Sequence, residues 1–236
     1  MAMCVMTSGI KGGTGKTIVC RTVAAYFLEK QLEFALIEAD RSNPDCYRAL
    51  ASEIDCRFAV FSEKEAHEDS ANSIYNLSIE TNTLVNLPAQ IEQPFYDFFF
   101  KNELLEIAPV DGVSFIILWV SDGGYDSLKL FRKSLEMLPI PHVFIKNYGR
   151  TEDWTGMEDK ELQQLIRDKK VKVIDFPRFM GRKTLNDIDS SSLSFTQALT
   201  HKGFTSIEKQ RVRRFLRDSA SQFDKVFSHL NQPIKA

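Results

Sequence analysis

The residues with the clearest chemical capacity lie in the segment KGGTGKT, residues 11–17. Its glycines allow successive backbone N–H groups to point inward without obstruction by a Cβ atom, and such a loop binds phosphate groups. In this pattern Lys16 contacts the β- and γ-phosphates of a nucleotide, and the hydroxyl of Thr17 binds Mg²⁺. We therefore expect a nucleotide site built from the loop and the residue after it: Gly12, Gly13, Thr14, Gly15, Lys16, Thr17 and Ile18.

The loop joins two apolar segments that support this interpretation. Met3–Met6 is a short run of strand type, and Ile18–Leu28 has an apolar helical pattern. A helix that begins at the loop adds its positive dipole end to the phosphate site. The alternative is a glycine-rich turn with a chance Lys-Thr pair, and the agreement of spacing, Lys-Thr and strand-loop-helix context argues against it.

Two positions distinguish this loop from the usual phosphate-binding loop. Ile10 stands where the usual loop has a glycine, and a second lysine, Lys11, precedes the glycines. The pattern resembles the ParA/MinD family of ATPases, whose signature is KGGxGK[ST]. The resemblance implies that the protein binds ATP and Mg²⁺, forms a homodimer on ATP binding, and uses Lys11 to reach the partner's nucleotide. Within one subunit Lys11 has no evident role; an ordinary solvated lysine is the alternative.

Short apolar runs alternate with amphipathic segments along the chain. The runs expected to form strands are Ala2–Thr7, Phe34–Glu38, Phe58–Phe61, Thr83–Leu87, Val113–Val120, His142–Lys146 and Val171–Asp175. Helices are expected, among others, at Ile18–Lys30, Tyr125–Leu138 and Asp159–Lys169. Many of the strands lack clean alternation, which indicates burial on both faces. The sequence therefore predicts an α/β fold with a doubly wound, mostly parallel sheet and helices on both faces, in a single domain over residues 1–236.

The composition is ordinary for a soluble globular protein, with 43% hydrophobic and 26% charged residues. No apolar run approaches the roughly 20 residues that cross a bilayer, and residues 1–10 lack the features of a secretory signal. We therefore expect a cytoplasmic protein without membrane insertion. The cysteines have neither metal-ligand spacing nor a paired framework and should be reduced: Cys4, Cys20, Cys46 and Cys56. The net charge of −2 predicts that any binding to nucleic acid needs a local patch.

Ligands of a parallel sheet bind at the carboxyl ends of its strands, where the remaining polar features lie. After the second expected strand, Asp40 stands where the resembled family has an acid that positions the attacking water. With Lys11 and Lys16 it forms the expected catalytic set, because phosphoryl transfer needs alignment and charge stabilisation more than covalent chemistry. Alternatively, Asp40 caps a helix that begins near Asn43, a role compatible with catalysis.

After the fourth expected strand, Asn86 departs from the resembled family, which has an Asp there that accepts from Mg²⁺-bound water. The expected metal site is therefore Thr17 and Asp40, with Asn86 acting through a bound water. Asn86 keeps an acceptor but loses the charge, and charge-assisted hydrogen bonds are about twice as strong as neutral ones. This hypothesis predicts weak Mg²⁺ retention, slow hydrolysis, and faster turnover in the variant Asn86→Asp.

The sixth expected strand runs into Asn147, whose amide both donates and accepts hydrogen bonds. In the resembled family an Asn at this place recognises the adenine base, so Asn147 is the candidate for base recognition. Pro177 and Arg178 follow the next strand and resemble the family's segment beside the base. An ordinary proline-containing loop is the alternative there.

The Ser121–Ser127 loop places hydroxyls and carboxylates beside two glycines, which would suit nucleophilic catalysis. It lacks the histidine or lysine base that a serine nucleophile needs. We therefore expect a turn followed by a helix cap. The histidines are far apart and show no metal-binding spacing: His67, His142, His201 and His229.

Near the end of the chain, a helix expected over Ser206–Leu230 has an apolar stripe on one face: Val212, Phe215, Leu216, Phe223, Val226, Phe227 and Leu230. The stripe leaves a basic patch exposed: Lys209, Arg211, Arg213, Arg214 and Arg217. The patch is either a solvated helix face or a non-specific contact with DNA phosphates. A membrane-bound helix fits less well, because the apolar stripe is committed to the core.

The resemblance covers the order of motifs over most of the chain and extends to the small plasmid ParA-like proteins of the TraL, MobD and VirC type. It implies a weak, partner-stimulated ATPase that dimerises and acts in plasmid partition or conjugative mobilisation, with a centromere-binding protein or a relaxase as activator. The alternatives are a MinD-like positioning ATPase with a protein or membrane partner, and a metabolic P-loop enzyme. A nitrogenase-type reductase would need a cysteine pair for an iron–sulfur cluster, which these cysteines do not supply.

Overall fold

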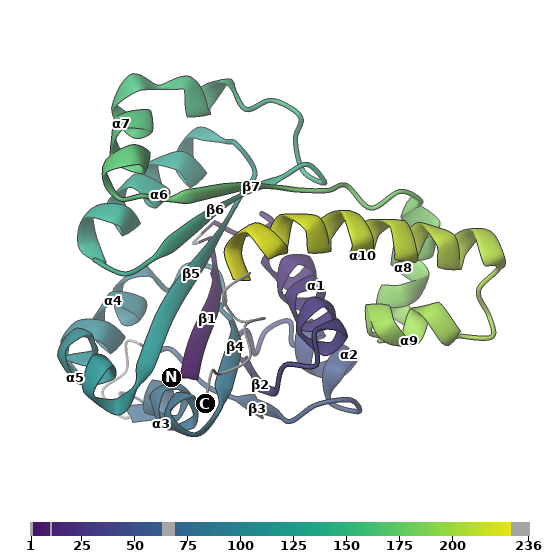
Figure 1. The fold of residues 1–236 in the computed structure, drawn as a ribbon, viewed down its shortest axis with the longest axis horizontal. Helices are drawn as coiled ribbons and strands as arrows, with labels where there is room; N and C mark the ends of the chain where they lie inside the picture. Colours follow the sequence, from purple (N-terminus) through teal and green to yellow (C-terminus); the bar gives the residue numbers. More distant parts are fainter. Residues whose placement is uncertain (1, 10, 63–68, 228–236) are drawn as a thin grey trace, which may run out of the picture.

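The computed structural model describes residues 2–9, 11–62 and 69–227. Its centre is a seven-stranded sheet in the order β3-β2-β4-β1-β5-β6-β7, and neighbouring strands are parallel. The strands are β1 (Ala2–Ser8), β2 (Phe34–Glu38), β3 (Cys56–Phe58), β4 (Asn82–Asn86), β5 (Val113–Ser121), β6 (His142–Asn147) and β7 (Lys172–Phe176). The predicted α/β fold with a doubly wound parallel sheet is confirmed (Figure 1).

Helices cover both faces of the sheet. One face carries α1 (Lys16–Glu29), α2 (Asp45–Leu50), α8 (Arg182–Ser190), α9 (Phe195–Thr200) and α10 (Ser206–Phe227). The other carries α3 (Asn72–Glu80), α4 (Glu92–Phe100), α5 (Leu104–Asp111), α6 (Tyr125–Met137), the 3-10 helix η2 (Thr155–Glu158) and α7 (Lys160–Asp168). Successive residues of β1 fill the two cores alternately, Val5 on the first face and Met6 on the second, because side chains of a strand alternate.

Two edge strands differ from the sequence prediction. The sequence predicts a strand at Phe58–Phe61, but β3 ends at Phe58, whose side chain is 46% exposed. β3 pairs only with β2, so the length of that pairing sets its bounds and the apolar run does not. At the other edge, β7 begins and ends one residue later than predicted.

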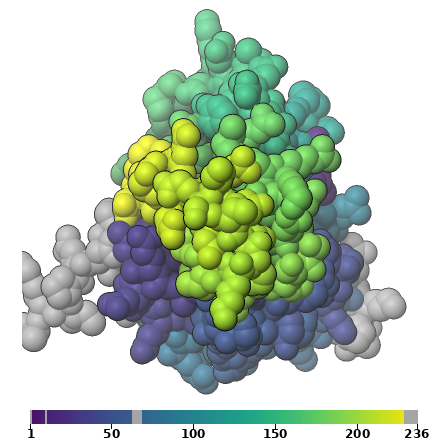
Figure 2. Space-filling view, turned by 90° about the vertical axis from the view of Figure 1, so that its right-hand side faces the viewer, coloured from purple at the N-terminus to yellow at the C-terminus, as the bar shows by residue number. Residues whose placement is uncertain are grey.

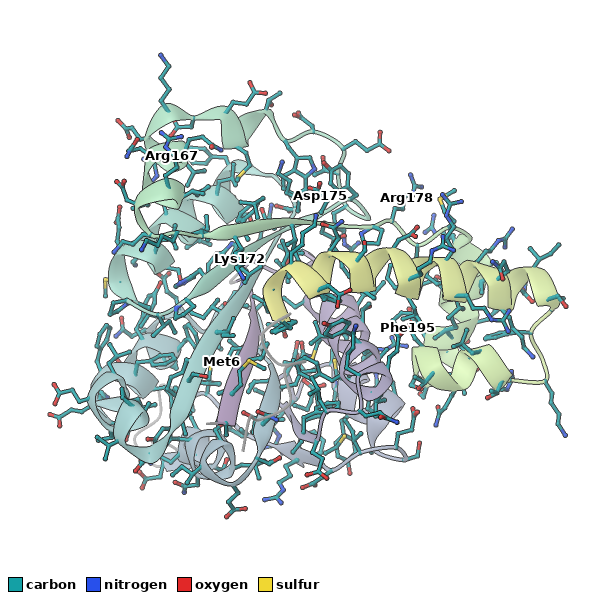
Figure 3. All side chains as sticks on the ribbon, in the orientation of Figure 1. Met6, Arg167, Lys172, Asp175, Arg178 and Phe195 are labelled. Atoms are coloured by element: carbon teal, nitrogen blue, oxygen red, sulfur yellow. The ribbon has the colours of Figure 1, made fainter. Side chains whose placement is uncertain are left out.

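The last helix confirms the predicted apolar stripe over the part of the chain that the structure describes. Val212, Phe215 and Phe223 are buried, with Val226 and Phe227, and Leu216 is half-buried. Phe195 of α9 packs against Phe215 with ring centroids 5.3 Å apart, which joins α9 to α10 (Figure 3). The predicted end of the helix at Leu230 lies outside the described residues.

The parallel arrangement brings the carboxyl ends of the strands to one edge. Thr7 is the register partner of Asn86 on β4, and Asn86 is the partner of Glu38 on β2. Three polar side chains from distant parts of the sequence are therefore neighbours at this edge.

None of the described helices has the length and apolar character that a membrane span requires. The cysteines are free thiols.

Candidate functional site

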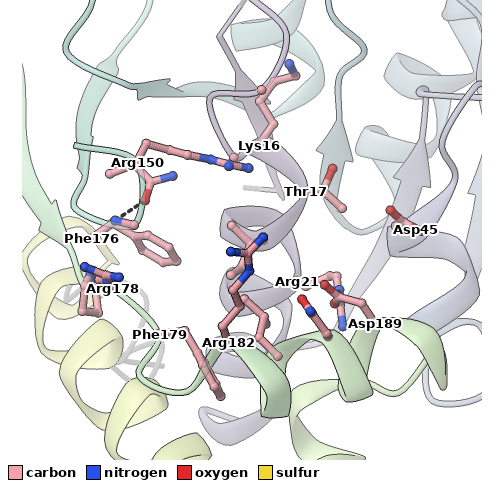
Figure 4. A pocket seen from close by; sticks show the side chains of 18 of the residues that line it. Lys16, Thr17, Arg21, Asp45, Arg150, Phe176, Arg178, Phe179, Arg182 and Asp189 are labelled. Carbon is pink, nitrogen blue, oxygen red and sulfur yellow. Dashed lines mark hydrogen bonds and ion pairs between the residues drawn. The ribbon is translucent and has the colours of Figure 1, made fainter.

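A cavity of about 730 Å³ opens at the carboxyl edge of the sheet, beside the beginning of α1 (Figure 4). This volume is typical of a small-molecule site. Its wall includes these residues selected from the sequence: Gly12, Gly13, Gly15, Lys16, Thr17, Ile18, Asp40, Asn147, Pro177 and Arg178. Lys11, Thr14 and Asn86 are not on the wall. The fold thus brings the phosphate-binding loop, the predicted acid and the predicted base-recognition residues to one cavity.

The loop bends closely around the N-terminus of α1. Gly13 and Gly15 have φ values of +80° and +98°, a region that L side chains rarely adopt. A Cβ atom on Gly15 would lie 2.3 Å from Nδ2 of Asn147, so the loop packs against the end of β6 without room for a side chain. Ile10 lies outside the described residues.

Lys16 is the first residue of α1 and is 7% exposed. Its Nζ donates to the carbonyl oxygens of Gly9 at 3.0 Å and Lys11 at 3.4 Å. Burial lowers the pKa of Lys16, and the charge of Asp40 opposes this shift. An ammonium group held by carbonyls at the wall of the cavity is suited to exchange them for phosphate oxygens, because charge-assisted hydrogen bonds are the stronger ones.

The residues present fit a Mg²⁺-bound nucleotide. The Oγ1 of Thr14 is buried without a hydrogen-bond partner, and no side chain caps the N-terminus of α1. The backbone N–H groups at the start of α1 therefore lack a side-chain cap where phosphates would bind, whereas Thr14 lies off the cavity wall. Thr17 and Asp40 supply oxygen ligands, and Mg²⁺ needs few of them because it keeps waters and phosphate oxygens. Within the described ranges no group of three His, Cys, Asp or Glu residues could hold a metal ion.

Asp40 lies on the cavity wall in a local turn. Its Oδ1 accepts a hydrogen bond from Oγ of Ser42 at 2.6 Å and from the backbone N–H of Asn43 at 3.2 Å. The helix that follows begins at Asp45, with Pro44 at its N-cap position and no side-chain cap. The alternative that Asp40 caps a helix beginning near Asn43 is therefore wrong. The catalytic role of Asp40 stays a prediction.

Glu38 is a functional candidate that sequence reasoning missed. One carboxylate oxygen accepts from Nδ2 of Asn86 at 2.8 Å and from the backbone N–H of Asp40 at 3.0 Å. The other accepts from the backbone N–H groups of Cys46 at 3.1 Å and Tyr47 at 3.3 Å. Burial raises the pKa of Glu38 to about 7, although the hydrogen bonds from Asn86, Asp40 and Tyr47 act in the opposite direction. The signal in the sequence is an acid at the end of an otherwise apolar strand.

Asn86 is 1% exposed and its amide is directed at Glu38. Its Oδ1 lies 3.4 Å from Oγ1 of Thr7. This orientation is the favourable one, because the opposite one would place the amide oxygen against a carboxylate. A role of Asn86 through Mg²⁺-bound water stays a prediction.

Lys11 forms an ion pair within the subunit. Its Nζ lies 3.0 Å from Oδ2 of Asp122, and the two side chains are 39% and 22% exposed. The hydrogen bond and the charge of Asp122 raise the pKa of Lys11. The expectation that Lys11 has no role inside one subunit is therefore wrong, because it links the phosphate-binding loop to the loop after β5.

The loop after β5 is a turn, as the sequence predicts. Oγ of Ser121 accepts from the N–H of Gly123, and Oδ1 of Asp122 accepts from the N–H of Gly124, both at 3.1 Å. The predicted helix cap is absent, since Gly124 occupies the N-cap position of α6 without a side-chain hydrogen bond. The side chains of this loop satisfy the turn and Lys11 instead of the helix.

Asn147 ties the end of β6 to the phosphate-binding loop. Its Nδ2 donates to the carbonyl of Thr14 at 2.7 Å, and its Oδ1 accepts from the N–H of Gly149 at 2.9 Å. A side-chain amide has two N–H groups and two lone pairs, so one of each remains for a base. Arg178 is exposed on the wall, and two further arginines not selected from the sequence line it, Arg150 and Arg182 (Figure 4).

Arg21 joins α1 to α8 and is a second feature that the sequence reasoning missed. It is 5% exposed, with Nη1 2.6 Å from Oδ1 of Asp189 and Nη2 2.8 Å from the carbonyl of Leu193. Its guanidinium lies over the ring of Phe195, 5.2 Å from the centroid. Arg21 and Asp189 both line the cavity, so α8 is attached directly to its wall.

The arginines of α10 face solvent as predicted, and Lys209 is half-buried. Asp218 pairs with Arg214 at 3.5 Å and with Arg217 at 3.2 Å, which partly neutralises the patch. Arg211 packs over Gly181, which directly precedes α8, so the patch continues toward the cavity wall. Figure 2 shows α10 and the preceding green segments as one continuous surface.

Comparisons with known proteins agree with this architecture. No protein-family model matches the chain. Protein MobD from Acidithiobacillus ferrooxidans is 23% identical over 199 residues, which cover 82% of this chain and 85% of MobD.

Two solved structures of MinD are similar to this protein over more than nine tenths of the chain. Septum site-determining protein MinD from Pyrococcus horikoshii, complexed with Mg-ADP, aligns over 99% of this chain and 100% of its own, with a TM-score of 0.52 and 14% identity. MinD from Aquifex aeolicus aligns over 92% and 95%, with a TM-score of 0.50 and 17% identity. The fold is that of the MinD/ParA-type P-loop ATPases, as the signature loop predicts.

Proposed function

We propose that the protein is a cytoplasmic, ATP-dependent switch that binds ATP with Mg²⁺, dimerises, hydrolyses ATP slowly, and acts on DNA in plasmid partition or conjugative mobilisation. The observation that carries the proposal is the cavity that joins buried Lys16, Thr17 and Asp40 to Asn147 at the carboxyl edge of the sheet. The similarity to MobD and the Mg-ADP bound in a MinD structure of this fold support it.

Residues at the two ends of the cavity have different roles. The loop N–H groups and Lys16 would bind the β- and γ-phosphates, and Thr17 and Asp40 would hold Mg²⁺, which would supply charge stabilisation for phosphoryl transfer. Asp40 would orient the attacking water. At the other end, the free half of the Asn147 amide contacts the base, with Pro177 and Arg178 beside it.

Lys11 supplies the second cation of the site from the partner subunit. Transition-state charge is best stabilised by a cation at a closed interface. Lys11 is 39% exposed and paired to a side chain, Asp122, that is itself partly exposed, so the pair can separate at small cost. In the dimer Lys11 leaves Asp122 for the nucleotide of the other subunit.

Two variants separate this role from a local structural one. Lys11→Ala should bind ATP yet neither dimerise nor hydrolyse it, whereas Asp122→Asn frees Lys11 and should dimerise at least as readily as wild type. The measurement is light scattering with ATP and Mg²⁺ under slow-hydrolysis conditions. Equal loss of dimerisation in both variants would show that the ion pair only supports the loop, and a wild type that stays monomeric contradicts the switch.

DNA binding is tested on the α10 patch. Arg213→Glu combined with Arg214→Glu should abolish ATP-dependent, salt-sensitive DNA binding and leave DNA-independent hydrolysis near wild type, because neither residue lines the cavity. Arg167→Glu in α7, combined with Lys169→Glu at the C-cap of that helix, makes the same charge change and should leave DNA binding intact, because α7 lies away from α10 (Figure 1). Polarisation titrations at two salt concentrations, with and without ATP, provide the measurement. DNA binding that survives the α10 substitutions removes this patch and leaves a protein partner, such as a relaxase or a centromere-binding protein, as the target.

A further inference from the structure

Glu38 lies two residues before Asp40 of the cavity wall, and its hydrogen-bond partners among the described residues are all donors. It is fully buried, and its two oxygens receive N–H groups from Asn86, Asp40, Cys46 and Tyr47. No described cation pairs with it. A buried charge without a counter-ion persists only where hydrogen bonds replace the water that it has lost.

The donors connect three parts of the site. Asp40 belongs to the turn on the cavity wall, Cys46 and Tyr47 form the first turn of α2, and Asn86 ends β4. Their common acceptor is one side chain, which is also the register partner of Asn86 in the sheet. The distance between the Asp40 turn, the start of α2 and the sheet is therefore fixed by Glu38.

We propose that Glu38 is a positioning residue for the reaction: it holds the Asp40 turn and the start of α2 at the phosphate end of the cavity, and Asn86 is its matched amide partner. The expected effect of Glu38 on turnover rests on the proposed ATPase function. The positions of the Asp40 turn and of α2 rest on the hydrogen bonds alone. Glu38 acts through Asp40, since it does not line the cavity itself.

The proposal reverses the expectation for Asn86→Asp. Nδ2 of Asn86 donates to Glu38 at 2.8 Å, so an aspartate there would place two buried carboxylates in contact. Like charges at this distance disfavour each other's ionised form. Asn86→Asp should therefore slow turnover rather than accelerate it.

The test is a double-mutant cycle. Glu38→Gln turns an amide nitrogen toward backbone donors and should lower turnover about tenfold, with nucleotide affinity within about threefold of wild type. Asn86→Asp should also lower turnover. In the double variant the aspartate accepts from the glutamine amide, so turnover should exceed that of both single variants. Asn82→Asp, the same change at the other end of β4, has its own contacts to Met3 and Glu33 and should combine additively with Glu38→Gln.

Amide hydrogen exchange in the nucleotide-free protein gives a readout that does not depend on activity. The amides of Asp40, Cys46 and Tyr47 should lose protection about tenfold in Glu38→Gln, and the double variant should recover it at Cys46 and Tyr47. A double variant that is no more active or protected than the worse single variant, including one that does not fold, overturns the proposal. Parallel loss of nucleotide affinity and turnover in Glu38→Gln also overturns it, because that pattern marks a purely structural residue.

The two proposals fail separately. A wild type without ATPase activity that shows the expected exchange pattern contradicts the proposed function and leaves the role of Glu38 in positioning the Asp40 turn intact. An active wild type with an additive cycle contradicts the role of Glu38 and leaves the ATPase function intact.

Discussion

Glu38 on β2 and Arg217 on α10 are both charged side chains, yet their surroundings differ in every respect. Glu38 is fully buried and receives hydrogen bonds from three backbone N–H groups and one side chain. Arg217 is exposed, with its side chain 70% accessible, and in the described part of the chain it pairs with Asp218, which also pairs with Arg214. Hydrogen bonds from neighbouring groups stabilise the charged form of Glu38, whereas water stabilises the charge of Arg217.

This difference teaches how substitutions should behave in each region. A buried polar group that loses its partner bears the full cost of desolvation, so its neighbours must change with it. Exposed ion pairs contribute roughly 0 to 1 kcal/mol each, so changes there should be nearly independent of one another. Four measurements test this contrast.

The largest effect is expected for Lys16, the buried ammonium of the phosphate-binding loop. Lys16→Ala removes charge-assisted hydrogen bonds to the phosphates and should weaken ATP binding about 10- to 100-fold, while the cavity wall stays in place. Isothermal titration with a non-hydrolysable ATP analogue measures this loss. Arg150→Ala, an exposed residue of the same wall, should change affinity less, and an equal loss would erase the distinction between the buried and exposed cations.

His142 gives the second measurement, since its imidazole is buried between Ser134 and the carbonyl of Ile140. Burial lowers its pKa to about 4 from 6.5. Between these values the unfolded chain binds a proton that the folded chain does not, so the free energy of unfolding falls as pH falls, by about 2 kcal/mol at pH 5.

Urea unfolding at pH 7.5 and 5.0 tests this, with His142→Asn as the comparison. Between pH 7.5 and 5.0 the free energy of unfolding of the variant should fall by about 2 kcal/mol less than that of wild type. The raised pKa of Glu38 has the opposite sign, but it is present in both proteins and cancels in the difference. Equal losses in the two proteins would show that His142 does not carry the effect.

Arg21 and Asp189 give the third measurement, because one partner of this ion pair is buried and the other is not. The side chains are 5% and 51% exposed. Asp189→Asn leaves a buried guanidinium without its counter-ion and should cost about 2 kcal/mol, more than Arg21→Met, which leaves an aspartate that water can reach. Chemical unfolding of both variants decides the order, and the reverse order contradicts the account.

The smallest effect is expected on the exposed face of α10. Arg217→Ala should change the free energy of unfolding by less than about 0.5 kcal/mol, because among the described residues its side chain pairs with Asp218 alone, at the surface. Thermal unfolding in low and high salt checks this. A larger change would mean that the α10 patch contributes to folding and is not reserved for a ligand.

Local patterns predicted most of the fold and the phosphate-binding part of the site. The apolar runs and the alternation of strand and helix patterns are properties of neighbouring residues, so they predicted the parallel sheet and the helix after the loop. The same holds for the loop itself, since glycines, lysine and threonine lie within residues 11–17. β3 was placed wrongly because an edge strand is bounded by its pairing with β2.

The contacts that local patterns could not predict join residues far apart in the chain. Glu38 and Asn86 are separated by 48 residues, and Arg21 and Asp189 by 168. No periodicity links such pairs, because strand order and register decide which side chains meet. For the same reason Lys11 was expected to have no role within one subunit, yet it pairs with Asp122 from the loop after β5.

Local sequence patterns were sufficient to predict a phosphate-binding loop between a strand and a helix, a parallel sheet covered on both faces, and a final helix with a basic outer surface. These features follow from residue types at fixed local spacing, which backbone geometry converts directly into structure. The tertiary structure alone decided that a buried glutamate takes the amide of Asn86, that Lys11 is paired, and that α8 is bound to the nucleotide helix through Arg21. These three contacts join residues that are distant in the chain. They form only when the folded arrangement of strands and helices brings those residues together.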